Sequence, residues 1–368
     1  MDLDLPRPCH LPNRARPQPA RRRPARHPRP ALADPQSLNS PSDESHPVTT
    51  TDLDDGPLET IRFIGLKPGP KLIVTGAVHG NEPCGPTAIR RAIEECRAGK
   101  IKILRGEVTF LPVTNPKAFR LKTREGDRNF NRDLRERPLA SDYEDRIGNP
   151  VCTLLRQHDA LLDIHSFRQE GEPFVFFGPA DNRGELEPFA RAEEEMALAS
   201  CLGVSTAIHG WLDNYARLLD IRSRLPVPKL NVTEGYGTTE FMRFCGGYAV
   251  TLECGTHDDP KAADIGYTAI SNTLAQLQLV DAPLPPAALS DVIEMVEVLL
   301  CGAEGDRAET GWRTGDAVKA GATLARRADG TKVTAPRDGY IIFPNVAPKL
   351  GEAICHFGVA SNRAIGVA

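Results

Sequence analysis

The sequence predicts an α/β protein: a mostly parallel or mixed sheet with helices on both faces, followed by a small all-β domain at the C-terminus. From about Asp52, short apolar runs that read as buried strands alternate with amphipathic runs at helical spacing, which is typical of a parallel sheet covered by helices. After residue 283 the apolar runs are short, β-like and separated by Gly, Asp-Gly and Pro turn signals.

Two amphipathic runs are predicted to be helices of the α/β part, and five apolar runs its strands. In the first helix, Ile89, Ile93 and Cys96 recur at helical spacing, and Gly99 ends the pattern. Pro260 precedes the second helix. The predicted helices are 85–99 and 260–280, and the predicted strands are 71–78, 108–113, 160–165, 173–178 and 248–255.

Composition divides the chain into three parts. The first thirty residues contain eight arginines and eight prolines with almost nothing apolar to bury, so residues 1–50 are predicted to be a disordered tail. A proline-rich linker, residues 281–289, separates the two remaining parts. We therefore expect a main α/β domain over 51–283 and a C-terminal β domain over 284–368.

Charge and hydropathy narrow the classes of partner. A formal net charge of -4 over 368 residues argues against binding of nucleic acid by the whole chain. No apolar run approaches the roughly 18 to 20 residues that cross a bilayer, so no membrane partner is expected. Nine scattered cysteines and no apolar signal core favour the cytoplasm. Homo-oligomer formation is left open.

Polar residues follow the first predicted strand at its carboxyl end. The stretch VTGAVHGNEPCGPTAI, residues 74–89, leads directly into His79 and Glu82. In a doubly wound sheet, ligands bind beyond the carboxyl ends of the strands. Two residues do not make a zinc site, because a catalytic zinc takes three protein ligands and keeps one open position. A loop histidine, and a carboxylate that favours a helix N-terminus, would look the same.

Two further strands end in residues of the same kind. His165 ends the strand 160–165, and Glu253 lies near the end of 248–255. Because the carboxyl ends of parallel strands meet at one sheet edge, these residues are expected to approach His79 and Glu82. Glu253 also has an alternative interpretation as a buried carboxylate paired with an arginine.

A polar loop adds candidate substrate-binding residues. The stretch KTREGDRNFNRDL, residues 122–134, contains Arg124, Asn131 and Arg132. This set can polarise a carbonyl and hold a carboxylate in bidentate fashion. A solvated basic loop is the alternative interpretation.

The motifs H-G-N-E (79–82), N-R (131–132), D-I-H-S (163–166) and L-E-C-G (252–255), in this order and at these separations, resemble the succinylglutamate desuccinylase and aspartoacylase family. Members of this family are relatives of the zinc carboxypeptidases. The resemblance covers roughly residues 55–280 by motif. It implies a zinc-carboxypeptidase-like fold for the α/β domain and one zinc ion per subunit.

Residue roles follow from the resemblance alone. It implies that His79, Glu82 and His165 bind the zinc ion. The same comparison makes Glu253 the general base and Arg124 the residue that polarises the scissile carbonyl and stabilises the oxyanion. It further implies that Asn131 and Arg132 hold a substrate carboxylate, and that Arg243, ten residues before Glu253, binds a second, side-chain carboxylate.

Departures from the family pattern limit what the resemblance implies about the substrate. Thr239 stands where aspartoacylase has a tyrosine that helps bind the side-chain carboxylate, so selectivity for aspartate is in doubt. The C-terminal tyrosine of aspartoacylase has no clear counterpart, with Tyr340 and Lys349 as the candidates. His257 is either a pocket residue or a surface loop histidine.

The resulting expectation is a zinc-dependent amidohydrolase, a deacylase of a small N-acyl amino acid such as an N-succinyl or N-acetyl amino acid. One alternative keeps the metal and acts on peptides as a zinc carboxypeptidase. The other is a protein that binds a small carboxylate without chemistry. The presence of Glu253 speaks against the latter, because a binding protein needs no general base.

Overall fold

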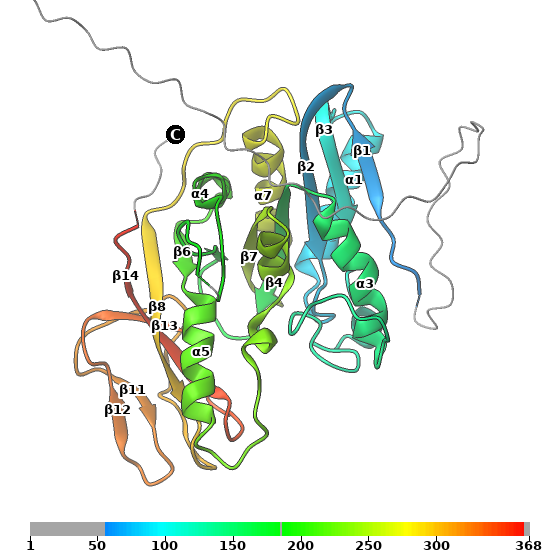
Figure 1. The fold of residues 1–368 in the computed structure, drawn as a ribbon. Coiled ribbons are helices and arrows are strands. Elements are labelled where there is room, and N and C mark those ends of the chain that lie inside the picture. Colours follow the sequence, from blue (N-terminus) through cyan, green and yellow to red (C-terminus); the bar gives the residue numbers. More distant parts are fainter. Residues whose placement is uncertain (1–55, 185, 364–368) are drawn as a thin grey trace, which may run out of the picture. The chain divides into compact units, whose positions relative to one another are not determined.

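The computed structural model of the protein describes residues 56–184 and 186–363. The predicted tail, residues 1–50, lies outside these ranges. An eleven-stranded sheet forms the framework, in the order β1-β3-β2-β4-β7-β5-β6-β8-β14-β13-β10, and a second sheet has the order β12-β11-β9 (Figure 1). The strands are β1 (Ile61–Ile64), β2 (Lys67–Gly76), β3 (Arg105–Leu111), β4 (Ala160–Phe167), β5 (Phe174–Phe176), β6 (Thr206–His209), β7 (Tyr248–Thr256), β8 (Asp291–Leu300), β9 (Arg307–Ala308), β10 (Ala317–Val318), β11 (Thr323–Arg326), β12 (Lys332–Thr334), β13 (Gly339–Ile342) and β14 (Ala353–Ala360).

The large sheet is mixed. Strands β3, β2, β4 and β7 run parallel to one another at its centre, and β5, β6 and β8 form a second parallel group. The two groups meet where β5 pairs antiparallel with β7. Both outer ends of the sheet are antiparallel, with β1 on β3 at one end and β14, β13 and β10 beyond β8 at the other. The predicted α/β class with a parallel or mixed sheet is confirmed.

Helices cover both faces of this sheet (Figure 1). One apolar core lies between the sheet and α1, α4 and α7, while a second lies between the opposite face and α3 and α6. Buried Leu161 and Ala249, on neighbouring strands, belong to this second core. The helices are α1 (Cys84–Arg97), α2 (Pro116–Leu121), α3 (Tyr143–Arg156), α4 (Ala192–Cys201), α5 (Trp211–Arg222), α6 (Thr238–Phe244) and α7 (Ala262–Gln276), with a 3-10 turn over Val232–Gly235.

All five predicted strands and both predicted helices are present, with ends that differ by a few residues. The helices α3, α4, α5 and α6 were not among the predicted elements. In α3, the acidic first turn and Pro150 interrupt the apolar pattern by which a helix is recognised. Asp142 nevertheless caps this helix, since its side chain accepts a hydrogen bond from the Asp145 N–H.

The described part of the C-terminal region, 284–363, contains strands and no helix, as predicted. Its strands do not all form a separate sheet: β8 pairs parallel with β6, so β8, β14, β13 and β10 extend the large sheet. Only β9, β11 and β12 of this region form the separate small sheet. The domain boundary at residue 284 stays a prediction.

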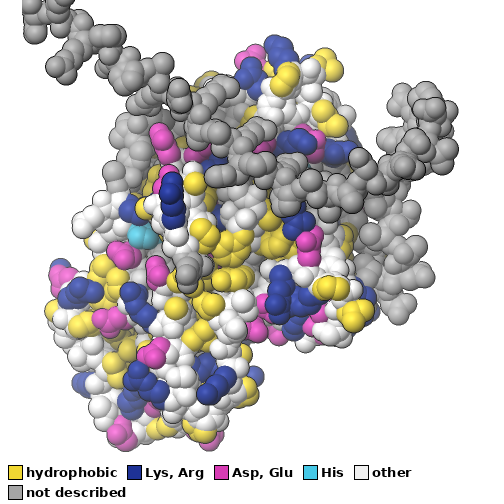
Figure 2. All heavy atoms as spheres, viewed as in Figure 1, with side chains coloured by type: hydrophobic (Ala, Val, Ile, Leu, Met, Phe, Trp, Pro, Cys, Tyr) yellow, Lys and Arg dark blue, Asp and Glu magenta, His cyan; other side chains and the backbone are white. Residues whose placement is uncertain are grey.

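The described surface carries charges of both signs. On the face shown in Figure 2, Lys and Arg side chains are mixed with Asp and Glu side chains. Within residues 56–184 and 186–363, no helix has both the length and the apolar character that crossing a bilayer requires.

Register between β4 and β7 places the polar residues of the predicted site. His165 on β4 is the direct partner of Glu253 on β7, and Asp163 is the partner of Thr251. Side chains at alternate positions of a strand lie on the same face, so His165, Asp163 and Glu253 share the face that carries α3 and α6.

Gly80, between His79 and Glu82, lies against the backbone of α2. A Cβ atom at this position would come within 1.9 Å of the Ala118 carbonyl carbon and 2.2 Å of the Phe119 nitrogen. Backbone atoms cannot give way as a side chain can, so only glycine allows this approach. The close contact holds the loop that carries both predicted ligands.

We predict that Gly80→Ala destabilises the protein by roughly 2–4 kcal/mol, because the added methyl group has no space. Gly148→Ala is the matched control: it lies inside α3, and its new Cβ would meet only Leu134 Cδ1, at 3.7 Å. Alanine is the better helix former, so this control should leave stability unchanged or raise it by up to about 1 kcal/mol. Thermal or urea unfolding measures both, and equal effects of the two substitutions would contradict the prediction.

Candidate metal centre and active site

His79, Glu82 and His165 come together at the carboxyl ends of β2 and β4. All three side chains are buried, and their candidate ligand atoms lie within 4.8 Å of one another. The carboxylate of Glu82 stands between the two rings, with Oε1 2.9 Å from His79 Nδ1 and Oε2 2.9 Å from His165 Nδ1. The structure thus brings the three predicted metal ligands into one cluster.

The outer nitrogen of each histidine ring faces an acceptor. His79 Nε2 donates to Asn129 Oδ1 at 3.1 Å, and His165 Nε2 donates to Asp163 Oδ2 at 2.9 Å. Acceptors in these positions keep a proton on Nε2, so Nδ1 is the nitrogen that faces Glu82 in both rings. Both rings therefore present the nitrogen that a metal ion would need.

Burial and mutual charge shift the pKa values inside the cluster. Burial lowers the pKa of His79 to about 4. Burial also opposes ionisation of Glu82 and of His165, but attraction to neighbouring opposite charges outweighs this effect. The pKa of Glu82 is well below its ordinary value, and Asp163 and Glu82 hold the pKa of His165 well above its ordinary value. Without a cation, the His165 proton balances the buried acidic charge.

The donor set fits a divalent cation such as zinc. His79 Nδ1 is buried and has no hydrogen-bond partner within the described residues, although Glu82 Oε1 is only 2.9 Å away. Buried polar atoms without partners are rare in folded proteins. Two imidazole nitrogens and one carboxylate oxygen make up the ligand set of a catalytic zinc site. An ion here would bind the unpaired nitrogen and replace the His165 proton as the balancing charge.

Glu253 lies beside this cluster on the neighbouring strand. Its side chain is buried, and Oε2 has no hydrogen-bond partner among the described residues. Burial raises the pKa of Glu253 to about 7. A carboxylate whose pKa lies near neutrality can both accept and return a proton at physiological pH.

Arg124 reaches the cluster from the loop after α2. Its Nη1 donates to Glu82 Oε1 at 3.2 Å, and 47% of its side chain remains exposed. The guanidinium therefore places a positive charge at the solvent side of the buried cluster.

Asn131 and Arg132 follow in the same loop. Asn131 Oδ1 accepts a hydrogen bond from Thr238 N at 2.9 Å, so Nδ2 is the donor of this amide. Arg132 Nη1 donates to the Asn131 carbonyl at 2.6 Å. Among the described residues no carboxylate is within ion-pair distance of Arg132, and burial lowers the pKa of its guanidinium. A half-buried guanidinium that has no carboxylate partner can bind a ligand anion.

Arg243 is not brought into the cluster. Its Nε donates to Glu195, its Nη1 to Glu187 and Glu240, and its Nη2 to the Ala249 carbonyl. All three nitrogens of this buried guanidinium already have protein acceptors, which are the contacts of a structural ion-pair network. A role of Arg243 in binding a second substrate carboxylate stays a prediction of the sequence alone.

The four residues whose roles the sequence left open, Thr239, His257, Tyr340 and Lys349, lie in different parts of the structure. His257 is a half-buried neighbour of the cluster, with Nδ1 2.8 Å from Ser166 Oγ and Nε2 3.3 Å from Asn81 Nδ2. Thr239 donates to Glu240, while Tyr340, on β13, packs partly buried against an apolar cluster. Lys349 lies in an exposed turn.

Asn129, Asp163 and Trp211 contact the predicted site, although the sequence did not identify them as site residues. Asp163 precedes His165 by two positions, so the strand period alone indicates that both share a face. Asn129 lies in the polar loop, two residues before Asn131. Trp211 gives no local signal, because it meets Arg132 only through the fold.

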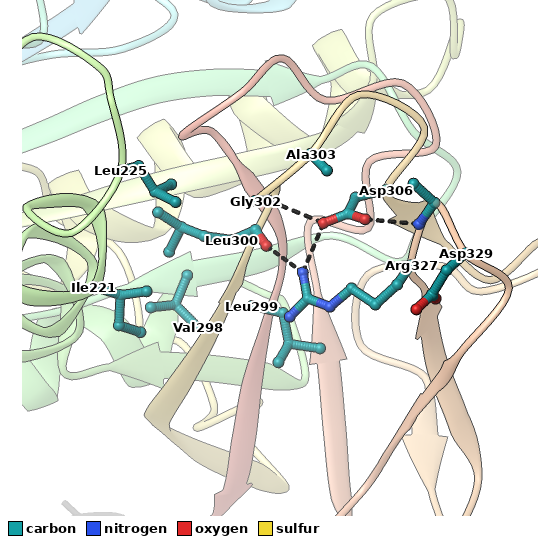
Figure 3. A pocket seen from close by; sticks show the side chains of 11 residues that line it. Ile221, Leu225, Val298, Leu299, Leu300, Gly302, Ala303, Asp306, Arg327 and Asp329 are labelled. Carbon is teal, nitrogen blue, oxygen red and sulfur yellow. Dashed lines mark hydrogen bonds and ion pairs between the residues drawn. The ribbon is translucent and has the colours of Figure 1, made fainter.

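A separate hollow of about 540 Å³ lies between α5 and the C-terminal strands (Figure 3). Apolar side chains such as Ile221, Leu225 and Val298 form one side, and the ion pair between Arg327 Nη1 and Asp306 Oδ2, at 2.8 Å, closes the other. None of the predicted site residues lines it, so this hollow is distinct from the candidate metal centre.

We predict that Glu253→Gln stabilises the metal-free protein at pH 8 and not at pH 4. The folded pKa of about 7 exceeds the ordinary value, so folding disfavours ionised Glu253, and this penalty appears as pH rises from about 4.5 through 7. The expected gain above pH 7 is roughly 1–3 kcal/mol. Urea unfolding of both proteins at several pH values, with chelator present, measures it. A gain that does not depend on pH would contradict the assignment.

Comparison with known proteins agrees with the motifs. Residues 68–201 match the model of the succinylglutamate desuccinylase/aspartoacylase catalytic domain. A search of curated protein sequences finds no match.

Solved structures share the fold. A succinylglutamate desuccinylase/aspartoacylase from Rhodobacter sphaeroides is 18% identical, with a TM-score of 0.63 over 83% of this chain and 89% of the other. The product-bound ectoine utilization protein EutE (DoeB) from Ruegeria pomeroyi is 22% identical, with a TM-score of 0.61 over 82% and 88%. An aspartoacylase family protein from Mesorhizobium loti is 18% identical, with a TM-score of 0.60 over 83% and 90%.

At these identities the solved structures show similarity of fold alone. The similarity to the family in sequence rests on the match over residues 68–201. The resemblance indicated by the sequence motifs is confirmed: this chain resembles the succinylglutamate desuccinylase/aspartoacylase family of acyl-amino acid hydrolases, in the sequence of the catalytic region and in the fold.

Proposed function

We propose that the protein is a zinc-dependent amidohydrolase that cleaves the amide bond of a small N-acyl amino acid and releases a carboxylic acid and an amine. The observation that carries the proposal is the buried cluster of His79, Glu82 and His165, whose candidate ligand atoms all lie within 4.8 Å of one another. The register of His165 with Glu253 adds a candidate base beside it. The match to the family's catalytic domain supports the same reaction class.

Each site residue then has a chemical task. His79, Glu82 and His165 would hold zinc, which supplies Lewis acidity and makes a water molecule acidic enough to react near pH 7. Glu253 takes a proton from the attacking water and returns it to the leaving amine, as the family resemblance implies. The positive charge of Arg124 stabilises the oxyanion that develops on the carbonyl, a contribution typically of a few kcal/mol.

Asn131 and Arg132 would orient the substrate by its carboxylate. Oδ1 of the Asn131 amide accepts from Thr238 N, and its Nδ2 would donate to the substrate carboxylate. Arg132 lacks a carboxylate partner among the described residues and can donate two parallel hydrogen bonds. Binding at this end decides which amide bond reaches the metal centre.

A turnover screen of the zinc-loaded protein tests the proposal. N-acetyl, N-succinyl and other N-acyl amino acids are offered, and the released amine is measured. We expect release from one subset of these substrates and loss of activity when a chelator removes the metal. No stoichiometric zinc after reconstitution, or release of amine that survives complete metal removal, would contradict the proposal.

We further predict that Glu253→Gln keeps zinc bound but lowers kcat by at least about a thousandfold, because the amide cannot take the proton. Zinc content is measured by elemental analysis and turnover by amine release. Since Glu253 is not one of the three proposed ligands, loss of zinc in this variant would count against the assignment, as would near-normal turnover.

A further inference from the structure

Trp211, the first residue of α5, lies against the guanidinium of Arg132. The distance from Arg132 Cζ to the centroid of the indole ring is 5.1 Å, which is within the range of a cation–π interaction. A guanidinium is planar, so stacking one face on a ring leaves its edge available for a carboxylate. Nη1 donates to the Asn131 carbonyl, and the same edge has no carboxylate partner among the described residues.

The same side chain also holds the segment that positions Asn131. Trp211 Nε1 donates to the Gly235 carbonyl at 2.9 Å. Two residues later, Gly237 leaves space for the Asn131 amide, since a Cβ atom there would lie 2.1 Å from Asn131 Oδ1. Thr238 N then donates to that oxygen at 2.9 Å. One tryptophan thus contacts Arg132 directly and Asn131 through the backbone of 235–238.

The indole ring is itself held from the other side. Ring centroids of Tyr215 and Phe176 lie 5.6 Å and 6.5 Å from it, and that of His356, on β14, lies 6.3 Å away. His356 Nδ1 is 2.9 Å from Asn214 Oδ1, and burial together with the charge of Arg132 lowers the pKa of His356 to about 4. An uncharged His356 packs on the tryptophan at neutral pH, so the C-terminal strands support the ring.

We propose that Trp211 is a positioning residue that determines specificity: it orients Arg132 and the Asn131-binding segment so that the site selects substrates with a free carboxylate over substrates with an uncharged end. The inference rests on the proposed carboxylate-binding role of Asn131 and Arg132. The proposal also gives β14 and α5 a function, since both hold the indole ring of Trp211 in place.

Tryptophan fluorescence tests the contact without relying on turnover. The chain has two tryptophans, so Trp312→Phe leaves Trp211 as the single reporter. Trp312 lies elsewhere, with its Nε1 on the Thr323 carbonyl. The zinc-loaded variant is mixed with N-acetylglycine or with N-acetylglycinamide in a stopped-flow instrument. We expect a saturable change in fluorescence with N-acetylglycine and none with N-acetylglycinamide. The change should be absent in Trp211→Phe, in which Trp312 remains. It should also be absent when Arg132→Ala is added to Trp312→Phe. A change that the amide reproduces, or no change, would overturn the proposal.

Kinetics separate positioning from a general structural role. Trp211→Leu removes the aromatic face, whereas Trp211→Phe keeps a ring and loses only the N–H. For the N-acyl amino acid that is turned over fastest, Trp211→Leu should raise KM by about tenfold with little change in kcat, and Trp211→Phe should raise it less. For the corresponding carboxamide, kcat/KM should stay within about twofold.

The two sets of measurements distinguish the possible failures. Equal losses on the acid and the carboxamide would show that Trp211 only supports the fold, and would overturn the specificity role. If the unsubstituted protein turns over none of the N-acyl amino acids, the proposed function fails, while the fluorescence experiment still decides whether Trp211 senses a bound carboxylate.

Discussion

The carboxylate of Glu82 is the group on which the arrangement of the site depends. It is buried between His79 Nδ1 and His165 Nδ1, at 2.9 Å from each, and it accepts a further hydrogen bond from Arg124. A carboxylate in a buried position is tolerated only if charge and hydrogen bonds compensate for lost water. Its surroundings therefore have to be fixed accurately, by the Gly80 contact on one side and by the strand β4 on the other.

A second layer of residues holds these groups in place. Asp163 accepts hydrogen bonds from His165, Thr75 and Thr238, and so connects β4 with β2 and the helix α6. The backbone nitrogen of Thr238 in turn donates to Asn131 Oδ1. These hydrogen bonds link the candidate metal-binding residues with the proposed carboxylate site. Second-layer contacts of this kind orient ligands and set the proton positions on histidine rings.

The two ends of a substrate would meet surfaces of different origin. The candidate metal-binding residues lie on strand β4 and in the loop that follows β2, beside the parallel strands of the sheet. The carboxylate end is built from the loop 122–134, which depends on α5, α6 and β14 for support. Placement beside the sheet suits the reacting groups, because small errors in their position are costly for catalysis. A loop, in contrast, allows the substrate-binding residues to differ between related proteins.

The sequence by itself determined the fold class, the presence of the central strands and the three candidate metal-binding residues, His79, Glu82 and His165. Strand and helix periods are local, and residues that follow parallel strands necessarily meet at one sheet edge. Only the tertiary structure decided the rest: Arg243 is surrounded by Glu195, Glu187 and Glu240, and Trp211 lies on Arg132. Apart from Glu240, which lies three residues before Arg243, these contacts join residues 48 to 79 positions apart, and no local pattern records them.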